Sequence, residues 1–163
     1  YILPEGGTNP LAYPGCAALA KEIIAQCPET PTHLAVACGT GGTLAGMLSG
    51  LPELNPPQVI GISVLKGDFM TGEIEQQLTT MGQNNTHWEV HSNFHHGGYA
   101  RQSTELMTFI QTFYQQHGIL LEPVYTGKLF FALYALLAQG YFPAGSRVVG
   151  IHTGGLQSFG CAV

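Results

Sequence analysis

HLAVACGTGGTLAG, residues 33–46, joins a run of small apolar residues to a glycine-rich turn and then to a second apolar run. The first run, 33–38, has the length and apolar character of a buried β-strand. The second, 44–51, is typical of a helix. Strand, glycine turn and helix in this order begin a βαβ unit, so this stretch predicts a parallel sheet with helices on its faces.

The rest of the chain repeats the alternation of short apolar strands with helices. Pro28 ends a helix expected over 11–27, and Gly118 ends one marked by the apolar spacing of 106–113. Further strands are expected over 59–64, 87–91 and 147–152, and further helices over 74–81 and 127–139. We therefore predict one α/β domain over residues 1–163, with a mostly parallel sheet in a three-layer αβα arrangement.

Composition limits the class of ligand. The formal net charge is −5, charged residues make up 9%, and there is no Lys/Arg run, which argues against nucleic acid or an anionic membrane as partner. The apolar run 129–138 is too short to span a bilayer. A small-molecule ligand is therefore expected. The four cysteines, Cys16, Cys27, Cys38 and Cys161, lack CxxC spacing, which predicts reduced thiols and a cytoplasmic protein.

The turn CGTGGT, 38–43, is suited to an anion, because its glycines let backbone N–H groups converge at the start of a helix. The Walker pattern fails because no Lys follows the last glycine. The dinucleotide pattern fails because Leu44 stands where its third glycine would be. A compact phosphate group therefore remains the expected ligand, and the alternative is that the glycines only permit a tight turn.

Five motifs, CGTGGTLAG, VLKGD, HHGGYAR, LEPVYTGK and HTGGLQ, follow one another between residues 38 and 157. In this order the chain resembles the D-cysteine desulfhydrase and 1-aminocyclopropane-1-carboxylate (ACC) deaminase family of fold-type-II pyridoxal-phosphate enzymes. The resemblance implies the larger lobe of a tryptophan-synthase-β-like fold, with pyridoxal 5'-phosphate as cofactor. It covers nearly the whole chain.

The resemblance also assigns roles to residues. The glycine loop is expected to hold the cofactor phosphate, the hydroxyl after the last strand to meet the pyridine nitrogen, and two tyrosines to face a small amino-acid substrate. The residues at these positions are Gly39, Thr40, Gly41, Gly42 and Thr43, then Thr153 with Gly154, and Tyr99 with Tyr125 as the catalytic candidates. A phenol could act as a base at neutral pH only if its surroundings lowered its pKa from about 10. Without the motifs, a buried aromatic is the simpler interpretation of either tyrosine.

One position separates two activities within the family. ACC deaminases carry Glu directly after the second tyrosine, whereas this chain has Thr126. The difference favours β-elimination of a D-amino acid such as D-cysteine to pyruvate, ammonia and sulfide. ACC deaminase is the alternative within the family, and a non-catalytic module that binds a phosphorylated ligand is the alternative from another class.

The family's Schiff-base lysine lies in an N-terminal lobe that this chain does not contain. Lys21, Lys66 and Lys128 are the only lysines here, and their places in a helix, a turn and a helix start favour structural roles. We therefore expect a C-terminal portion of a two-lobed enzyme that is inactive alone. By analogy with the family, the whole enzyme would be a homodimer.

Other polar groups carry weaker signals. His91, His95 and His96 with Cys38 lack the spacing of a zinc site, so no metal is expected. Glu122 is interpreted either as a buried acid or as a helix-capping residue. The turns at 5–9 and 66–68 are interpreted as structural loops.

Overall fold

Four parallel strands form the central sheet in the computed structural model, which describes residues 2–156. They are β1 (His33–Cys38), β2 (Gln58–Ser63), β3 (Trp88–His91) and β4 (Val148–Gly150), in the order β3-β2-β1-β4. Every pairing is parallel. The predicted α/β class and all four predicted strands are confirmed. β4 ends before the predicted 152, although Ile151 N still donates to Ala35 O of β1 at 2.9 Å.

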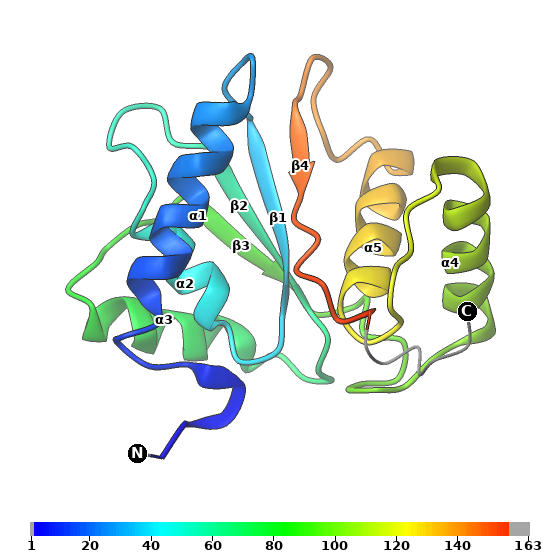
Figure 1. The fold of residues 1–163 in the computed structure, drawn as a ribbon, viewed down its shortest axis with the longest axis horizontal. Helices are drawn as coiled ribbons and strands as arrows, with labels where there is room; N and C mark the ends of the chain where they lie inside the picture. Colours follow the sequence, from blue (N-terminus) through cyan, green and yellow to red (C-terminus); the bar gives the residue numbers. More distant parts are fainter. Residues whose placement is uncertain (1, 157–163) are drawn as a thin grey trace.

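Helices cover both faces of the sheet (Figure 1). On one side lie α1 (Tyr13–Gln26), α2 (Gly42–Leu48) and α3 (Met70–Thr80), and on the other lie α5 (Thr126–Ala138) and, outside it, α4 (Thr104–His117). The predicted three-layer arrangement is confirmed, with α4 packed on α5 rather than on the sheet. Within residues 2–156, no helix is long and apolar enough to cross a bilayer.

Local sequence explains where α4 begins and ends. The Ser103 hydroxyl accepts a hydrogen bond from Leu106 N at 3.1 Å, so it caps the first turn. The helix ends at Gly118, whose φ of 67° lies in the left-handed region that glycine adopts without strain, as the sequence predicts.

Two apolar cores lie on the two faces of the sheet. Leu34 and Val36 of β1 face the α1–α3 side, where Leu44 and Ile74 are also fully buried. On the other face, a second set packs under α5, made up of Ala35, Ile60, Ile62, Phe94, Leu129, Ala132, Leu133 and Leu136. Successive side chains of β1 thus point into opposite cores, so both faces of this strand are covered by apolar residues.

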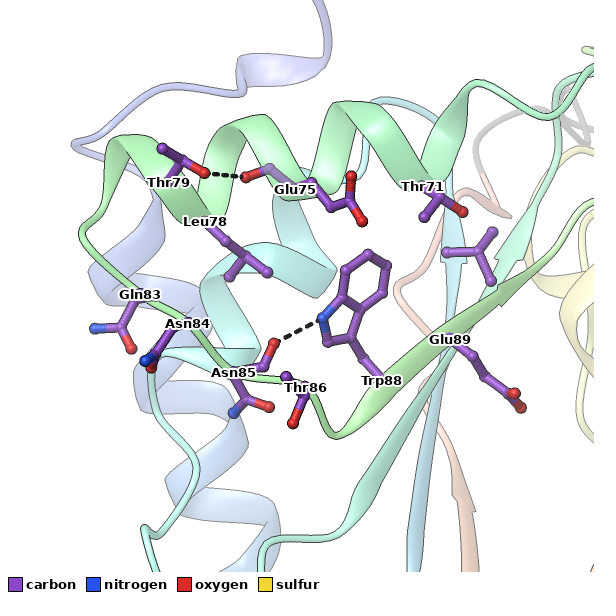
Figure 2. A pocket seen from close by; sticks show the side chains of 11 residues that line it. Thr71, Glu75, Leu78, Thr79, Gln83, Asn84, Asn85, Thr86, Trp88 and Glu89 are labelled. Atoms are coloured by element: carbon purple, nitrogen blue, oxygen red, sulfur yellow. Dashed lines mark hydrogen bonds between the residues drawn. The ribbon is translucent and has the colours of Figure 1, made fainter.

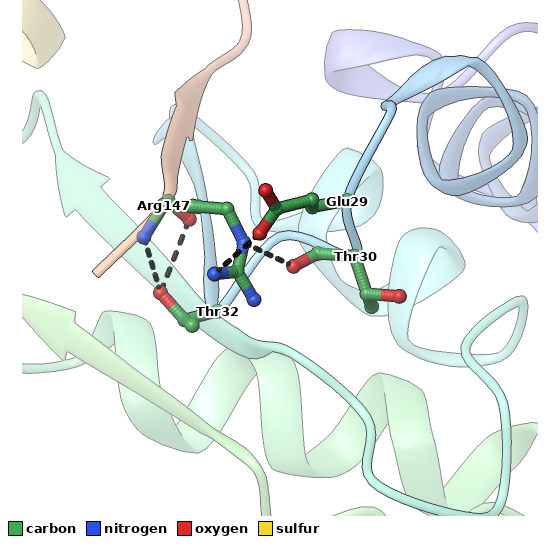
Figure 3. A network of polar contacts seen from close by, with 4 residues as sticks. All are labelled: Glu29, Thr30, Thr32 and Arg147. Carbon is green, nitrogen blue, oxygen red and sulfur yellow. Dashed lines mark hydrogen bonds and ion pairs between the residues drawn. The ribbon is translucent and has the colours of Figure 1, made fainter. Parts of the chain in front are cut away.

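Arg147 joins the amino ends of β1 and β4 (Figure 3). Its backbone N–H donates to Thr32 Oγ1 at 2.9 Å, and its carbonyl accepts from Thr32 N at 2.9 Å. Its guanidinium donates to Thr30 O at 2.9 Å and forms an ion pair with Glu29 at 3.0 Å. These contacts fix β4 beside β1 at the end of the sheet opposite the glycine turn.

The strand order places a topological switch point at β1. From β1 the chain moves through α2 to β2 and β3, and it returns through α4 and α5 to β4 on the other side of β1. In open parallel sheets, ligands bind beyond the carboxyl ends of the strands where the order reverses. The motifs CGTGGT and HTGG follow β1 and β4, so both lie at this edge, which is the lower end of the sheet in Figure 1.

Candidate functional site

The glycine loop, residues 39–42, leaves β1 and enters α2. Gly41 has a φ of 79°, and a Cβ at this position would lie 2.7 Å from Ile74 Cγ1, so both conformation and space require glycine. Gly41 is also the N-cap of α2 and provides no side-chain cap to its first amides. The glycines of the loop therefore present only backbone at the switch point.

Thr40 is held by contacts on both sides. Its hydroxyl lies 2.5 Å from Thr8 Oγ1, and its carbonyl accepts from Gln77 Nε2 at 2.7 Å. A Cβ on Gly42 would lie 2.6 Å from Thr8 Oγ1, so the turn 5–9 packs directly against the loop. The sequence-based interpretation of 5–9 as a structural loop did not identify Thr8 as a neighbour of the site, and the two glycines of this turn were the available signal.

The two predicted tyrosines lie together beside this loop. Tyr125 OH donates to Tyr99 OH at 3.3 Å, and the two ring centroids are 6.0 Å apart. A Cβ on Gly39 would lie 3.2 Å from Tyr125 Cε1. The structure therefore brings together three motifs that are far apart in sequence: the glycine loop, HHGGYAR and EPVYTGK.

Tyr125 is not poised to be a base in this arrangement. Burial raises the pKa of its phenol well above the usual value near 10, and the hydrogen bond and negative potential of Tyr99, followed by the charges of Glu122 and Glu5, act in the same direction. The phenol is therefore protonated at neutral pH, where it donates to Tyr99. Tyr99 is the more exposed of the pair, with 55% of its surface accessible.

Glu122 fixes the start of α5. It is 1% exposed, and its carboxylate accepts hydrogen bonds from the amides of Val124, Tyr125 and Thr126, each at 2.6 Å. A carboxylate that takes several N–H groups at a helix start satisfies amides that have no intrahelical partner. Both interpretations of Glu122 hold, since it is a buried acid and a cap. Its hydrogen bond to the amide of Tyr125 also fixes the backbone of that residue at the start of α5.

The HTGG segment lies against the same carboxylate. A Cβ on Gly155 would come within 2.8 Å of Glu122 Cγ, and His152 Nε2 lies 2.9 Å from Leu120 O. Gly154 N donates to His152 Nδ1 at 3.2 Å. Thr153 is exposed after β4, and within residues 2–156 its side chain makes no hydrogen bond. Thr153 and Gly154 are thus at the predicted edge without direct hydrogen bonds to the glycine loop.

The chain is similar to known pyridoxal-phosphate-dependent enzymes. The family model "Pyridoxal-phosphate dependent enzyme" matches residues 1–154. The chain belongs to the pyridoxal-phosphate-dependent enzyme family. The likeness inferred from the five motifs is therefore confirmed at the level of the family and its cofactor, pyridoxal phosphate.

Relatives within this family carry two names. A putative ACC deaminase of Pyrococcus horikoshii is 33% identical, with 96% of this chain and 50% of the relative covered. A D-cysteine desulfhydrase of Klebsiella pneumoniae (strain 342) is 31% identical, with 95% of this chain and 50% of the relative covered. The chain therefore spans about half the length of the curated relatives it matches, which agrees with its likeness to a C-terminal portion.

Solved structures agree on the fold. The crystal structure of an ACC deaminase homologue matches 96% of this chain and 49% of its own at a TM-score of 0.83, with 33% identity. A threonine deaminase of Solanum lycopersicum matches 93% of this chain and 46% of its own at 0.57, with 14% identity, which shows a shared fold alone. The predicted fold-type-II class is confirmed.

Lys128 differs from the other two lysines in its burial. Lys21 and Lys66 are exposed, as their places in α1 and in the turn after β2 suggested. Lys128, in the first turn of α5, is fully buried, and its Nζ donates to Gly98 O at 2.7 Å. Sequence pattern alone does not predict this burial, because a lysine near a helix start is usually solvated.

The histidines have individual partners. His91 Nε2 lies 3.1 Å from Glu89 Oε1, His96 Nδ1 lies 2.8 Å from Ser103 Oγ, and His95 Nδ1 accepts from the amide of Gly97 at 2.9 Å. Within residues 2–156, no three His, Cys, Asp or Glu side chains are grouped so that they could hold a metal ion. The HHGGYAR histidines therefore act as loop contacts.

A separate cleft of the described chain lies away from these residues. It occupies about 760 Å³ between α3 and β3, where the Trp88 ring faces Glu75 and Leu78 (Figure 2). Trp88 Nε1 donates to Asn85 O at 2.9 Å, so its polar edge is satisfied by the chain. The cleft is lined by none of the residues predicted for the site, and it is an open groove at the sheet edge rather than part of the switch point.

Proposed function

We propose that the loop Gly39–Thr43 binds the phosphate of pyridoxal 5'-phosphate, while Thr153 and Gly154 lie toward the pyridine nitrogen. The backbone of the loop supports this assignment, because Gly41 occupies a conformation and a space that exclude a Cβ. Uncapped amides at the start of α2 suit an anion. The Thr40 and Thr43 hydroxyls supply further donors of the kind a phosphate accepts.

The observation that carries the proposal is the contact of Tyr125 with both Gly39 and Tyr99. It puts two phenols directly beside the proposed phosphate loop, where they would line the substrate side. When bound, the cofactor supplies an electron sink at the substrate's α-carbon. Tyr125, protonated at neutral pH, would orient the substrate or Tyr99 as a hydrogen-bond donor, and the more exposed Tyr99 would meet the substrate.

The proposed reaction is the β-elimination of a D-amino acid, with D-cysteine as the first candidate. The desulfhydrase named among the relatives supports it. Thr126 supports it as well, because a threonine at this position provides no carboxylate near the cofactor ring. Its hydroxyl accepts a hydrogen bond from Glu122 N at 3.0 Å. ACC deamination remains the alternative, supported by the names of the Pyrococcus relatives. Assay of the whole enzyme with both substrates separates them.

The whole enzyme would have two lobes, with residues 1–163 as one α/β domain and the Schiff-base lysine on the other lobe. Lys128 supports this view, because it is buried and committed to Gly98 O. We propose that the chain alone is inactive, and that the whole enzyme is a cytoplasmic homodimer. The unpaired thiols of Cys16, Cys27 and Cys38 are consistent with a reducing compartment.

Cofactor binding can be tested on the chain itself. Pyridoxal phosphate is titrated and followed by absorbance, with ATP and inorganic phosphate as competitors. We expect saturable binding that Gly41→Ala abolishes, while Gly82→Ala, at a remote glycine of similar φ, leaves it unchanged. Equal affinity for ATP and pyridoxal phosphate would instead support the non-catalytic phosphate-binding module.

The proposal that no lysine of this chain forms the Schiff base can be tested separately. The chain is incubated with pyridoxal phosphate, reduced with borohydride and analysed by peptide mass spectrometry. We expect no stoichiometric adduct on Lys21, Lys66 or Lys128. A single fully modified lysine would show that the chain carries the reactive amine itself.

A further inference from the structure

Lys128 is a buried cation without a close counter-ion. Its side chain is 0% exposed, and the ion pairs among residues 2–156 do not include it. Burial lowers the pKa of its amine, an effect that the negative charge of Glu122 opposes. An ammonium removed from water is unfavourable by several kcal/mol unless its donors are well satisfied. Stability alone therefore gives no reason for a lysine here.

The two acceptors of Lys128 belong to segments that carry site residues. Nζ donates at 2.7 Å to Gly98 O, in the residue directly before Tyr99. It also lies 3.5 Å from Val64 O. The amide of Val64 donates to Cys38 O at 3.0 Å, and Cys38 directly precedes the glycine loop.

Lys128 itself stands close to the second tyrosine. It follows Tyr125 by three residues, so the two lie about one helical turn apart at the start of α5. A single side chain thus connects the helix that carries Tyr125 with the loop that carries Tyr99 and, through Val64, with the end of β1. These are the three segments that meet at the site.

We propose that Lys128 is a positioning residue that holds Tyr99 opposite Tyr125. The Lys128 ammonium donates to the carbonyl of Gly98, and this hydrogen bond fixes the backbone directly before Tyr99. The Tyr99 hydroxyl is thereby kept within 3.3 Å of the Tyr125 hydroxyl. The consequence for catalysis rests on the proposed function, whereas the positioning itself does not. The second anchor of the loop is His96, which contacts Ser103 and the Phe131 ring at a centroid distance of 4.4 Å.

The test is a double-mutant cycle read by NMR on protein labelled with ¹³C at tyrosine Cζ. Tyr99→Phe removes the hydroxyl partner of Tyr125 and displaces the Tyr125 resonance. In a Lys128→Met background we expect the same substitution to displace that resonance by less than half as much. Lys128→Met should keep or raise the thermal midpoint, because methionine fills similar space without a buried charge. No cofactor is present, so the result is independent of whether the proposed function holds.

Lys21 is an exposed lysine on α1, and Lys21→Met is the matched control. It should leave the displacement of the Tyr125 resonance by Tyr99→Phe unchanged. An undiminished displacement in folded Lys128→Met would overturn the proposal. Should that variant not fold, wild-type NMR decides: the proposal requires slowly exchanging Lys128 ammonium protons with a nuclear Overhauser contact to Gly98 Hα. Rapid exchange or a missing contact would refute it.

Discussion

Glu122 and Thr126 are joined reciprocally, since the amide of Thr126 donates to Glu122 Oε1 at 2.6 Å and the amide of Glu122 donates to Thr126 Oγ1 at 3.0 Å. Each side chain thus satisfies the backbone of the other across the first turn of α5. The arrangement resembles a capping box, in which two otherwise unpaired amides are satisfied together. Because Tyr125 lies between them, its orientation depends on this pair.

Glu122→Gln should destabilise the chain markedly. Replacing one carboxylate oxygen by NH₂ sets a donor against a backbone donor in a buried site, which we expect to lower the free energy of unfolding by about 2 kcal/mol. Urea unfolding measures the change. Glu53→Gln, at an exposed loop position, should have almost no effect. Equal stability of the two variants would show that the Glu122 contacts contribute little.

Gly41→Ala should lose more stability than Gly82→Ala. Both glycines have a positive φ, 79° and 67°, so both substitutions carry a backbone penalty of about 1 kcal/mol. Only at Gly41 does the new Cβ approach Ile74 Cγ1, to 2.7 Å, whereas nothing lies within 4 Å at Gly82. We expect a further loss of about 2 kcal/mol from this overpacking, measured by urea unfolding. Equal losses of unfolding free energy in the two variants would show that only the backbone conformation, and not the contact with Ile74, opposes the substitution.

The raised pKa of Tyr125 predicts a dependence of stability on alkaline pH. Because the folded-state pKa lies above the unfolded value near 10, the neutral phenol favours the folded state fully below pH 10. That contribution is lost as pH rises above 10, where the unfolded chain releases the proton first. Unfolding midpoints measured from pH 8 to 11 should therefore fall less steeply in Tyr125→Phe than in wild type.

Tyr141 offers a comparison within the same experiment. Burial, together with Glu89, raises the pKa of its phenol to about 12, so Tyr141→Phe should also flatten the alkaline decline. The two substitutions lie in different parts of the chain and should act additively. If neither variant differs from wild type above pH 10, the phenols do not hold their protons as the geometry implies.

The hydrogen bond from the Arg147 side chain to Thr30 O should contribute more to stability than the ion pair of Arg147 with Glu29. Glu29 is 73% and Arg147 47% exposed at the side chain, so Glu29→Gln is expected to lower the free energy of unfolding by only about 0.3 kcal/mol, and less in high salt. Arg147→Met also removes the Nε donor to Thr30 O, and the expected loss is about 1 kcal/mol. Cofactor binding should be unchanged in both, because this network lies at the opposite end of the strands. Reduced binding would reveal coupling across the sheet.

Local pattern was sufficient to predict the elements of this fold. Residues 34–38 are apolar, as expected of a strand covered on both faces, and Gly118 ends α4 because it adopts a positive φ. The ends of the elements depend on more than local pattern. α2 begins at Gly42, two residues before its apolar run, because the loop glycines themselves enter the helix. The family could also be recognised, since its motifs are contiguous in sequence.

The sequence by itself thus determined the βαβ alternation, the glycine loop and the family, because each depends on neighbouring residues. Only the tertiary structure decided that β4 lies beside β1, that Thr8 packs on Thr40, and that Lys128 is buried against Gly98 O. These depend on pairings between residues about 30 or more positions apart, and no local spacing encodes which distant carbonyl will meet a given ammonium. The protonation of Tyr125 belongs to the same class, because burial and the Tyr99 hydroxyl exist only once the layers have packed.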